Sequence, residues 1–394
     1  MLNIFFIRDG VFELKNILLC ILVMLLLCPK VMAEEIKLAP NAKGVVLMEV
    51  STGEIIYERD ANVKNAPASM TKMMSMLLFM EAIEKGNISW DEKVKVSANA
   101  SSMGGSQILL ETNEIMTVTD LLKGVAIGSG NDATVALAER VGGTEDHFVQ
   151  MMNEKVKKLG LKNTNFKNVH GLDEANHYSS AYDMAIIARE LVKHEKILEF
   201  SSIYETYLRA NTDRKFWLVN TNKLVRFYQG VDGLKTGYTS EAGFCLTATA
   251  KKADMRLIAV VFGEPDSTMR NNEVSAMLDY GFNVYAIERV LSGESNIGTV
   301  EVVKGKREKA ILVPKEDVNI LYQKSVGKKN ITYKVNVGKL HAPISKGDIV
   351  GNIDILENDK LIRSIDVTIK ESIKKANILE LYIRYLGDII KGLC

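Results

Sequence analysis

The strongest constraint on the fold is a set of three short motifs that stand in a fixed order. Ser69-Met70-Thr71-Lys72 precedes a long apolar helical run, and Ser129-Gly130-Asn131 and Lys235-Thr236-Gly237 follow it. A serine three residues before a lysine places a hydroxyl and an amine on the same helix face. An amine shielded from water there gives up its own proton and accepts the proton of the hydroxyl. Each motif alone is weak evidence, but together they predict a site for acyl transfer on a serine.

Ser69 and Lys72 are the predicted nucleophile and base. Ser69 stands where a helix begins, so free backbone N–H groups and the helix dipole favour developing negative charge beside it. Lys72 must be desolvated and must have a cationic neighbour if its amine is to be neutral near pH 7. Lys235 is the candidate for that neighbour.

Ser129 and Asn131 suit a loop that reaches a cleft from a helical region, because small residues surround them. A serine hydroxyl there can pass a proton to a leaving amine. An asparagine side chain has both a donor and an acceptor, so it can hold Lys72 and a substrate amide together. We therefore assign Ser129 to catalysis and Asn131 to binding.

The third motif, which we place at the start of a strand, is expected to bind the substrate. Lys235 attracts a carboxylate, the hydroxyl of Thr236 binds it, and Gly237 lets another backbone come close to the strand. The substrate would then lie as an added strand on this edge. The backbone N–H groups of Ser69 and Tyr238 are candidate oxyanion donors.

Each motif also has a simpler explanation. A Ser-x-x-Lys sequence occurs by chance in most long chains, a lone Ser-Gly-Asn is usually a turn, and a lone Lys-Thr-Gly is usually a solvated loop. The order of the motifs and their expected structural context favour the functional interpretation.

The N-terminus resembles an export signal. Every residue from Ile17 to Cys28 is apolar or cysteine, Lys15 precedes this run, and Ala33 offers a small-residue cleavage site. The run is too short for a typical membrane span, so we interpret residues 1–33 as a signal peptide and expect an exported, extracytoplasmic protein. A buried helix or an uncleaved anchor are the alternatives.

Composition excludes several other classes of protein. The chain has 394 residues, enough for about two to three domains, and its net charge of +1 gives no reason to expect a nucleic-acid partner. The histidines are scattered, and no cysteine–histidine cluster has zinc spacing, so we predict no metal and no cofactor. Without the leader only Cys245 and Cys394 remain, which make no disulfide framework. Cys245 is the candidate for a small core residue.

The region from 34 to 292 carries all three motifs, and its pattern indicates an α+β layer with a central antiparallel sheet. The elements that we expect are a hairpin over 44–57, helices over 73–83, 119–122 onward, 133–141 and 148–159, a strand pair over 246–250 and 257–262, and a helix over 272–286.

The chain changes character after about residue 293. Short strands near 300–303, 311–313, 320–322, 333–337 and 349–356 are separated by Gly, Lys and Asn turns, so residues 293–369 are predicted to form a small all-β domain. Residues 370–394 have helical periodicity, with apolar residues on one face. This amphipathic helix either packs on the β domain or lies in a membrane surface; we favour the membrane.

The residues around the motifs resemble the low-molecular-mass penicillin-binding proteins, and more narrowly the D-alanyl-D-alanine carboxypeptidases of the serine peptidase class. The matching stretches are Ala66–Lys72, Ser129–Ala133, Gly233–Thr239, Met152-Asn153, Leu159–Leu161, His170–Leu172 and Asn220–Leu224. The resemblance implies a penicillin-recognising, β-lactamase-like domain with a helical subdomain. It also implies removal of the terminal D-alanine from peptidoglycan stem pentapeptides, acylation of Ser69 by β-lactams, and a role in cell wall biogenesis.

Two other interpretations share parts of this pattern. A class A β-lactamase would carry an aspartate in the middle of the second motif and a glutamate with an asparagine four residues later, and this chain has Gly130 and lacks that spacing around 173–176. A non-catalytic wall-binding protein would have no need for intact Ser69, Lys72 and Lys235.

Overall fold

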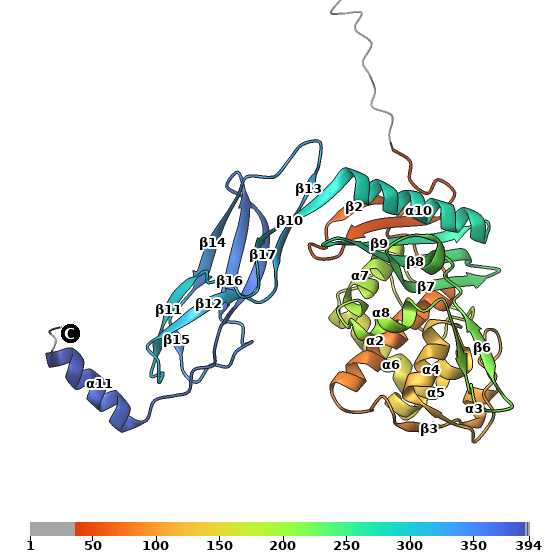
Figure 1. The fold of residues 1–394 in the computed structure, drawn as a ribbon, viewed down its shortest axis with the longest axis horizontal. Helices are drawn as coiled ribbons and strands as arrows, with labels where there is room; N and C mark the ends of the chain where they lie inside the picture. The colour runs from red at the N-terminus through yellow and green to blue at the C-terminus, as the bar shows by residue number, and fades with distance from the viewer. Residues whose placement is uncertain (1–35, 391, 393–394) are drawn as a thin grey trace, which may run out of the picture. The chain divides into compact units, whose positions relative to one another are not determined.

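A five-stranded antiparallel sheet organises the first part of the computed structural model, which describes residues 36–390 and 392 (Figure 1). Its order is β2 (Ile55–Arg59), β1 (Gly44–Glu49), β9 (Met255–Glu264), β8 (Gly243–Lys252) and β7 (Val231–Thr239). The predicted hairpin is formed by β1 and β2, and the predicted strand pair by β8 and β9. The expected α+β fold with a central antiparallel sheet is confirmed, and β7 is an edge strand.

Alternate residues of the central strands enter two separate cores. Val46 of β1 and Val260 of β9 pack against the helical region, whereas Val45 and Val261 pack on the side of α10 (Ser267–Val284). Figure 1 shows α10 along one side of the sheet and the helices between residues 72 and 201 on the opposite side. This alternation is the period of two that a strand covered on both faces requires.

The helical region surrounds α2 (Lys72–Glu84), whose side chains are buried on nearly every side. The longer helices around it are α4 (Val118–Ala126), α5 (Asn131–Gly142), α6 (Glu145–Lys158) and α7 (Ala181–Leu191). The shorter helices are η1 (Ala68–Thr71), α3 (Ala98–Ser101), α8 (Lys196–Ser201) and α9 (Leu224–Phe227). Two small antiparallel pairs complete this part: β3 (Lys93–Lys95) pairs with β4 (Ile115–Thr117), and β5 (Glu205–Leu208) pairs with β6 (Phe216–Val219).

Several helices begin earlier than the apolar pattern predicts. Thr117, Thr144 and Ser180 stand directly before α4, α6 and α7, and each accepts a hydrogen bond from a backbone N–H in the first turn, so polar caps mark where these helices begin. The predicted helix over 272–286 was wrong at its end, because Tyr285 and Ala286 already belong to β10 (Tyr285–Leu291).

The last part of the chain contains the predicted β domain. A six-stranded sheet has the order β14 (Ile331–Val337), β16 (Gly351–Glu357), β17 (Lys360–Ile369), β12 (Lys309–Pro314), β11 (Gly298–Val303) and β15 (Leu340–His341), and β13 (Val318–Gln323) pairs with β10. Ile353, Ile355, Val367 and Ile369 are fully buried in a core of their own. The all-β character is therefore confirmed, although the pattern did not reveal β10, β15 or β17.

The C-terminal helix α11 spans Ile378–Ile390. The prediction of a helix over the whole of 370–394 was wrong for residues 370–377, which are extended and make bridges through Ile373 and Lys375. None of the residues of α11 is buried. The predicted signal peptide and Cys394 lie outside the described residues, whereas Cys245 is a buried free thiol, as expected for a core residue.

Candidate active site

Ser69 lies in a tight turn that runs directly into the central buried helix. The 3-10 turn η1 carries Ser69, and α2 begins at Lys72. Ala68 before it has φ +46°, a left-handed conformation that is strained for a residue with a side chain. This turn places the hydroxyl of Ser69 on the wall of a cleft.

Lys72 is completely buried beneath Ser69. Its Nζ lies 2.9 Å from Ser69 Oγ, 2.6 Å from Asn131 Oδ1 and 2.7 Å from the carbonyl oxygen of His170. Burial lowers the pKa of this amine well below its usual range, and the charge of Lys235 lowers it further, against the opposing effect of Asp132. A neutral amine has two hydrogens. These two fit the Asn131 and His170 oxygens, which leaves the nitrogen lone pair for the hydroxyl of Ser69.

The second motif is held between α4 and α5. Ser129 has φ +62° and is almost fully buried, and its Oγ has no hydrogen-bond partner among the described residues. Asn131 begins α5, and its Nδ2 donates to the carbonyl oxygen of Gly104. The buried carboxylate of Asp132 accepts from the backbone N–H groups of Ile108 and Leu110, which fixes the neighbouring loop.

The third motif lies in the middle of β7, so the prediction that it begins a strand was wrong. Lys235 is buried, its Nζ donates to the carbonyl oxygen of Thr236, and burial together with the charge of Arg270 lowers the pKa of Lys235 to about 7. A side chain at Gly237 would come within 2.9 Å of the Pro67 carbonyl oxygen. Glycine is therefore needed where β7 passes the turn that carries Ser69.

The three motifs meet at one cleft of about 460 Å³. Ser69, Ser129, Thr236, Gly237 and Tyr238 line it directly. Lys72, Asn131 and Lys235 are buried behind the lining residues, where Lys72 contacts Ser69, the backbone N–H of Asn131 donates to Ser106, and Lys235 contacts Thr236. The structure thus brings together the residues of every predicted site position, with a buried amine next to a hydroxyl at the cleft wall.

Comparisons with known proteins agree with this geometry. The family described as D-alanyl-D-alanine carboxypeptidase, Peptidase S11, matches residues 30–266. The chain belongs to that family. The C-terminal domain of penicillin-binding protein 5 matches residues 286–375, which include strands β11 to β17.

Known relatives cover between about two thirds and nine tenths of this carboxypeptidase. The D-alanyl-D-alanine carboxypeptidase DacF of Bacillus subtilis is 50% identical over 359 residues, which cover 90% of this chain and 92% of DacF. Penicillin binding protein 5 of Haemophilus influenzae has a solved structure with a TM-score of 0.71 and 32% identity, covering 87% of this chain and all of that one. Penicillin-Binding Protein D2 of Listeria monocytogenes, solved in a cefotaxime-bound form, has a TM-score of 0.56 and 30% identity and covers 63% of this chain and 99% of that one.

Sequence reasoning missed two contributors to the carboxypeptidase site. The carbonyl oxygen of His170 binds Lys72, and Arg270 of α10 lines the cleft while its side chain is almost fully buried. The carbonyl oxygen has no signature in a sequence. Arg270 did have a sequence signature, because it shares the buried face of α10 with Val274, Met277 and Leu278. A single arginine on an otherwise apolar helix face is unusual and suggests a function.

Proposed function

We propose that this carboxypeptidase removes the terminal D-alanine of peptidoglycan stem pentapeptides through an acyl-enzyme on Ser69. The observation that carries the proposal is the position of the buried Lys72 amine, 2.9 Å from Ser69 Oγ with oxygen acceptors for its other hydrogens. The family supports the choice of substrate, and the role is in cell wall biogenesis and maturation.

The first chemical step transfers the Ser69 hydroxyl proton to Lys72 as Oγ bonds to the carbonyl carbon of the penultimate residue. The negative charge that develops on the carbonyl oxygen is stabilised by the backbone N–H groups of Ser69 and Tyr238. The bond to the terminal D-alanine then breaks, and its nitrogen receives the proton that Lys72 had accepted, passed on through the Ser129 hydroxyl, which has no other partner among the described residues. Water afterwards hydrolyses the ester on Ser69.

The substrate is held by its terminal carboxylate and by its backbone. Lys235 and Thr236 bind the carboxylate, and the buried guanidinium of Arg270 adds positive charge to the same cleft. Asn131 binds a substrate amide while it orients Lys72. Because β7 is the edge of its sheet, the peptide can pair with it as an additional strand along Lys235, Thr236 and Gly237.

The same serine accounts for reaction with β-lactams. A β-lactam carries a carboxylate and a strained amide, so it presents the same groups to Ser69 and Thr236 as the peptide does. The Listeria penicillin-binding protein that resembles this chain has been solved in ampicillin-bound and cefotaxime-bound forms, which supports the proposal.

The proposed location is the outer face of the cell membrane, after export and removal of residues 1–33. None of the described helices combines the length and the apolar character needed to cross a bilayer. The helix α11 has exposed apolar side chains, among them Leu379, Tyr382, Ile383, Leu386 and Ile390, that suit a position in the membrane surface.

One experiment tests the catalytic proposal directly. Mass spectrometry of a pentapeptide incubated with the protein should show loss of one alanine, and penicillin should add its full mass at Ser69. The Ser69→Ala variant, compared at equal folded concentration, should show neither change. Loss of alanine by that variant would contradict the acyl-enzyme, and rapid hydrolysis of penicillin would instead favour a β-lactamase.

A further inference from the structure

A loop between α6 and α7 contacts the turn that carries the nucleophile. It is closed at its base by two backbone hydrogen bonds between Asn165 and Tyr178, at 2.9 and 3.1 Å, and Asn165 Nδ2 also donates to the carbonyl oxygen of Asn176 at 2.6 Å. We call residues 165–178 the histidine loop. These bonds hold the two ends of the loop together.

The histidine loop supplies contacts to both η1 and α2. The carbonyl oxygen of His170 accepts from Lys72 at 2.7 Å, and that of Val169 accepts from Ser75 Oγ at 2.6 Å. Gly171, at φ +91°, approaches Ala68 so closely that an added side chain would lie 1.9 Å from the Ala68 carbonyl oxygen. The position of the loop therefore sets the position of one acceptor of Lys72.

The imidazole of His177 joins the loop to the nucleophile turn. Its Nδ1 lies 3.0 Å from the backbone N of Lys167, and its Nε2 lies 2.8 Å from Thr71 Oγ1. A backbone N–H only donates, so Nδ1 must be the unprotonated acceptor. In a neutral ring Nε2 then carries the hydrogen and donates it to Thr71, which is fully buried between Ser69 and Lys72.

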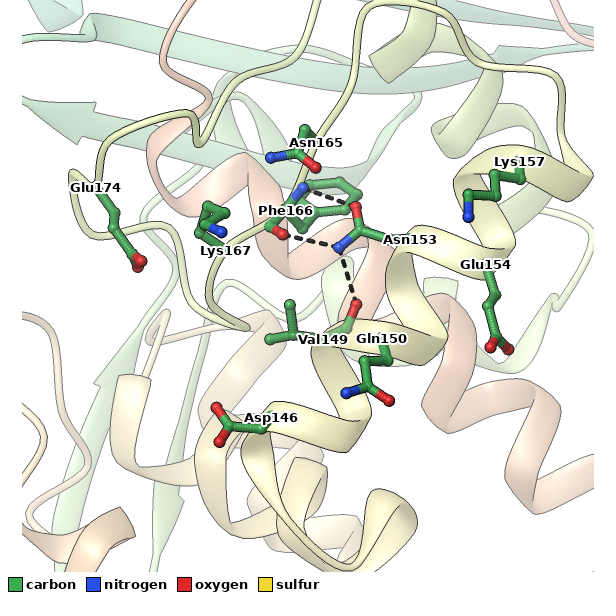
Figure 2. A pocket seen from close by; sticks show the side chains of 10 residues that line it. All are labelled: Asp146, Val149, Gln150, Asn153, Glu154, Lys157, Asn165, Phe166, Lys167 and Glu174. Atoms are coloured by element: carbon green, nitrogen blue, oxygen red, sulfur yellow. Dashed lines mark hydrogen bonds between the residues drawn. The ribbon is translucent and has the colours of Figure 1, made fainter.

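The donor to His177 is itself fixed to α6. Figure 2 shows Asn153 reaching from α6 to Phe166, with Asn153 Nδ2 donating to the Phe166 carbonyl oxygen at 2.8 Å and Asn153 Oδ1 accepting from the Phe166 N–H at 3.0 Å. The ring of Phe166 stands edge-on to His177 with centroids 5.8 Å apart. Lys167 is the next residue, so these contacts hold in place the backbone N–H that donates to His177.

We propose that His177 is a positioning residue that acts through Thr71. By donating to the Thr71 hydroxyl it locks the histidine loop onto the turn that carries Ser69, and so keeps the His170 carbonyl oxygen where Lys72 needs it. The inference rests on the proposed roles of Ser69 and Lys72. No contact of His177 with substrate is involved.

The charge state of His177 is compatible with this role. Burial lowers the pKa of its imidazole to about 4, against the opposing charges of Glu174 and Asp173 on the same loop. The other ionisable groups near it are His170, and Lys64 and Glu241, which line the same surface hollow. The ring is therefore neutral at neutral pH and keeps one donor and one acceptor.

A double-mutant cycle tests the coupling. Thr71→Val keeps the shape of the side chain and removes the hydroxyl, and His177→Phe keeps an aromatic ring and removes both nitrogens. Each change should slow acylation by fluorescent penicillin about 10-fold, since a buried hydrogen bond is lost. The double variant should be no slower than the slower single variant, because both changes break one link. Thr71→Ser should acylate like the parent.

Further measurements separate positioning from general damage. His341→Phe, at an exposed histidine of the β domain, is the matched control and should leave acylation unchanged. In the full chain labelled with 15N-histidine, the ring shifts of His177 should report a protonated Nε2 and a bare Nδ1. The opposite tautomer, fully additive losses, or singles that acylate normally would overturn the proposal. Labelling of Ser69→Ala, tested alongside, would instead refute the proposed function itself.

Discussion

The amine of Lys72 and the side-chain oxygen of Asn131 lie 2.6 Å apart, although 59 positions separate them in the chain. The Nδ2 of the same amide donates to Gly104 at 2.7 Å, which fixes the orientation of the oxygen toward Lys72. That the acceptor at this position is uncharged affects the protonation state of Lys72. The acceptor orients the amine without stabilising the protonated form as strongly as a carboxylate would.

Asn131→Asp should therefore slow acylation while keeping the shape of the site. The new carboxylate would raise the pKa of Lys72 and hold it protonated, so that it no longer accepts the Ser69 proton. We expect acylation by penicillin at pH 7 to fall about 100-fold and to recover partly as pH rises. Stopped-flow labelling between pH 6 and 10 measures both effects. An unchanged rate at pH 7 would show that Lys72 is not the base.

Lys235→Met should stabilise the protein and inactivate it. Burial lowers the pKa of Lys235 from 10.5 to about 7, so the unfolded chain binds more protons than the folded one between these values, and stability rises with pH there. The cost of burying this lysine is therefore full below pH 7 and fades toward pH 10.5. An apolar residue of similar length removes that cost. We expect a gain of about 1–2 kcal/mol at pH 7 that shrinks toward pH 10. Denaturant unfolding checks it, with exposed Lys251→Met as control.

The same pKa predicts how substrate binding changes with pH. Below pH 7 the Lys235 ammonium is charged and can attract the terminal carboxylate, and above pH 7 the free enzyme loses that charge. KM for a pentapeptide should thus be flat below pH 7 and rise above it, by at most about tenfold per pH unit. An N-acyl substrate amidated at its terminus should lack this rise. If KM depends on pH in the same way for both substrates, Lys235 does not bind the terminal carboxylate.

Glu264 predicts a separate effect of pH on stability. Both of its buried carboxylate oxygens lack a donor among the described residues, and burial together with nearby Glu273 raises the pKa of Glu264 to about 8. Because this pKa lies above the usual 4.5, the stabilising protonated form is lost as pH rises through 8. The free energy of unfolding should fall by about 2 kcal/mol between pH 6 and 9. Glu264→Gln should remove that fall, whereas exposed Glu241→Gln should not.

Much of this fold could be predicted from the sequence, because the spacing of apolar residues along the chain distinguishes strands from helices. The strand pair β8 and β9 and the helix α2 were predicted close to their observed bounds, because their apolar runs end at charged residues or glycine. Helix starts were placed late, since the first turn of α6 is polar and only the cap formed by Thr144 reveals it. The first two residues of β10, Tyr285 and Ala286, were taken for helix because β10 follows α10 without a break.

The candidate site was predictable to the extent that it depends on side chains in recognisable order. The three motifs led to Ser69, Lys72, Asn131 and Lys235 because their order along the chain, with the first motif directly before a buried helix, rarely arises by chance. The remaining parts depend on tertiary packing. No local pattern says that the His170 carbonyl oxygen turns toward Lys72, or that the Thr71 hydroxyl meets His177 across the fold.

The last prediction concerns α11, whose apolar side chains are not buried by any part of the chain that the structure describes. Ile383 and Leu386 are 62% and 40% exposed, while Arg384 on another face pairs with Glu308 at 2.8 Å. If the apolar face enters a membrane surface, Ile383→Glu with Leu386→Glu should weaken binding to liposomes at least about 10-fold, since two buried aliphatic side chains are replaced by charges. Asp388→Asn, a change that leaves the apolar face intact, serves as the control. Acylation by penicillin should be the same in all three proteins, because the active-site cleft is lined by residues between Ser69 and Asn271. Co-sedimentation that is unaffected by the double change would show that α11 instead packs on protein.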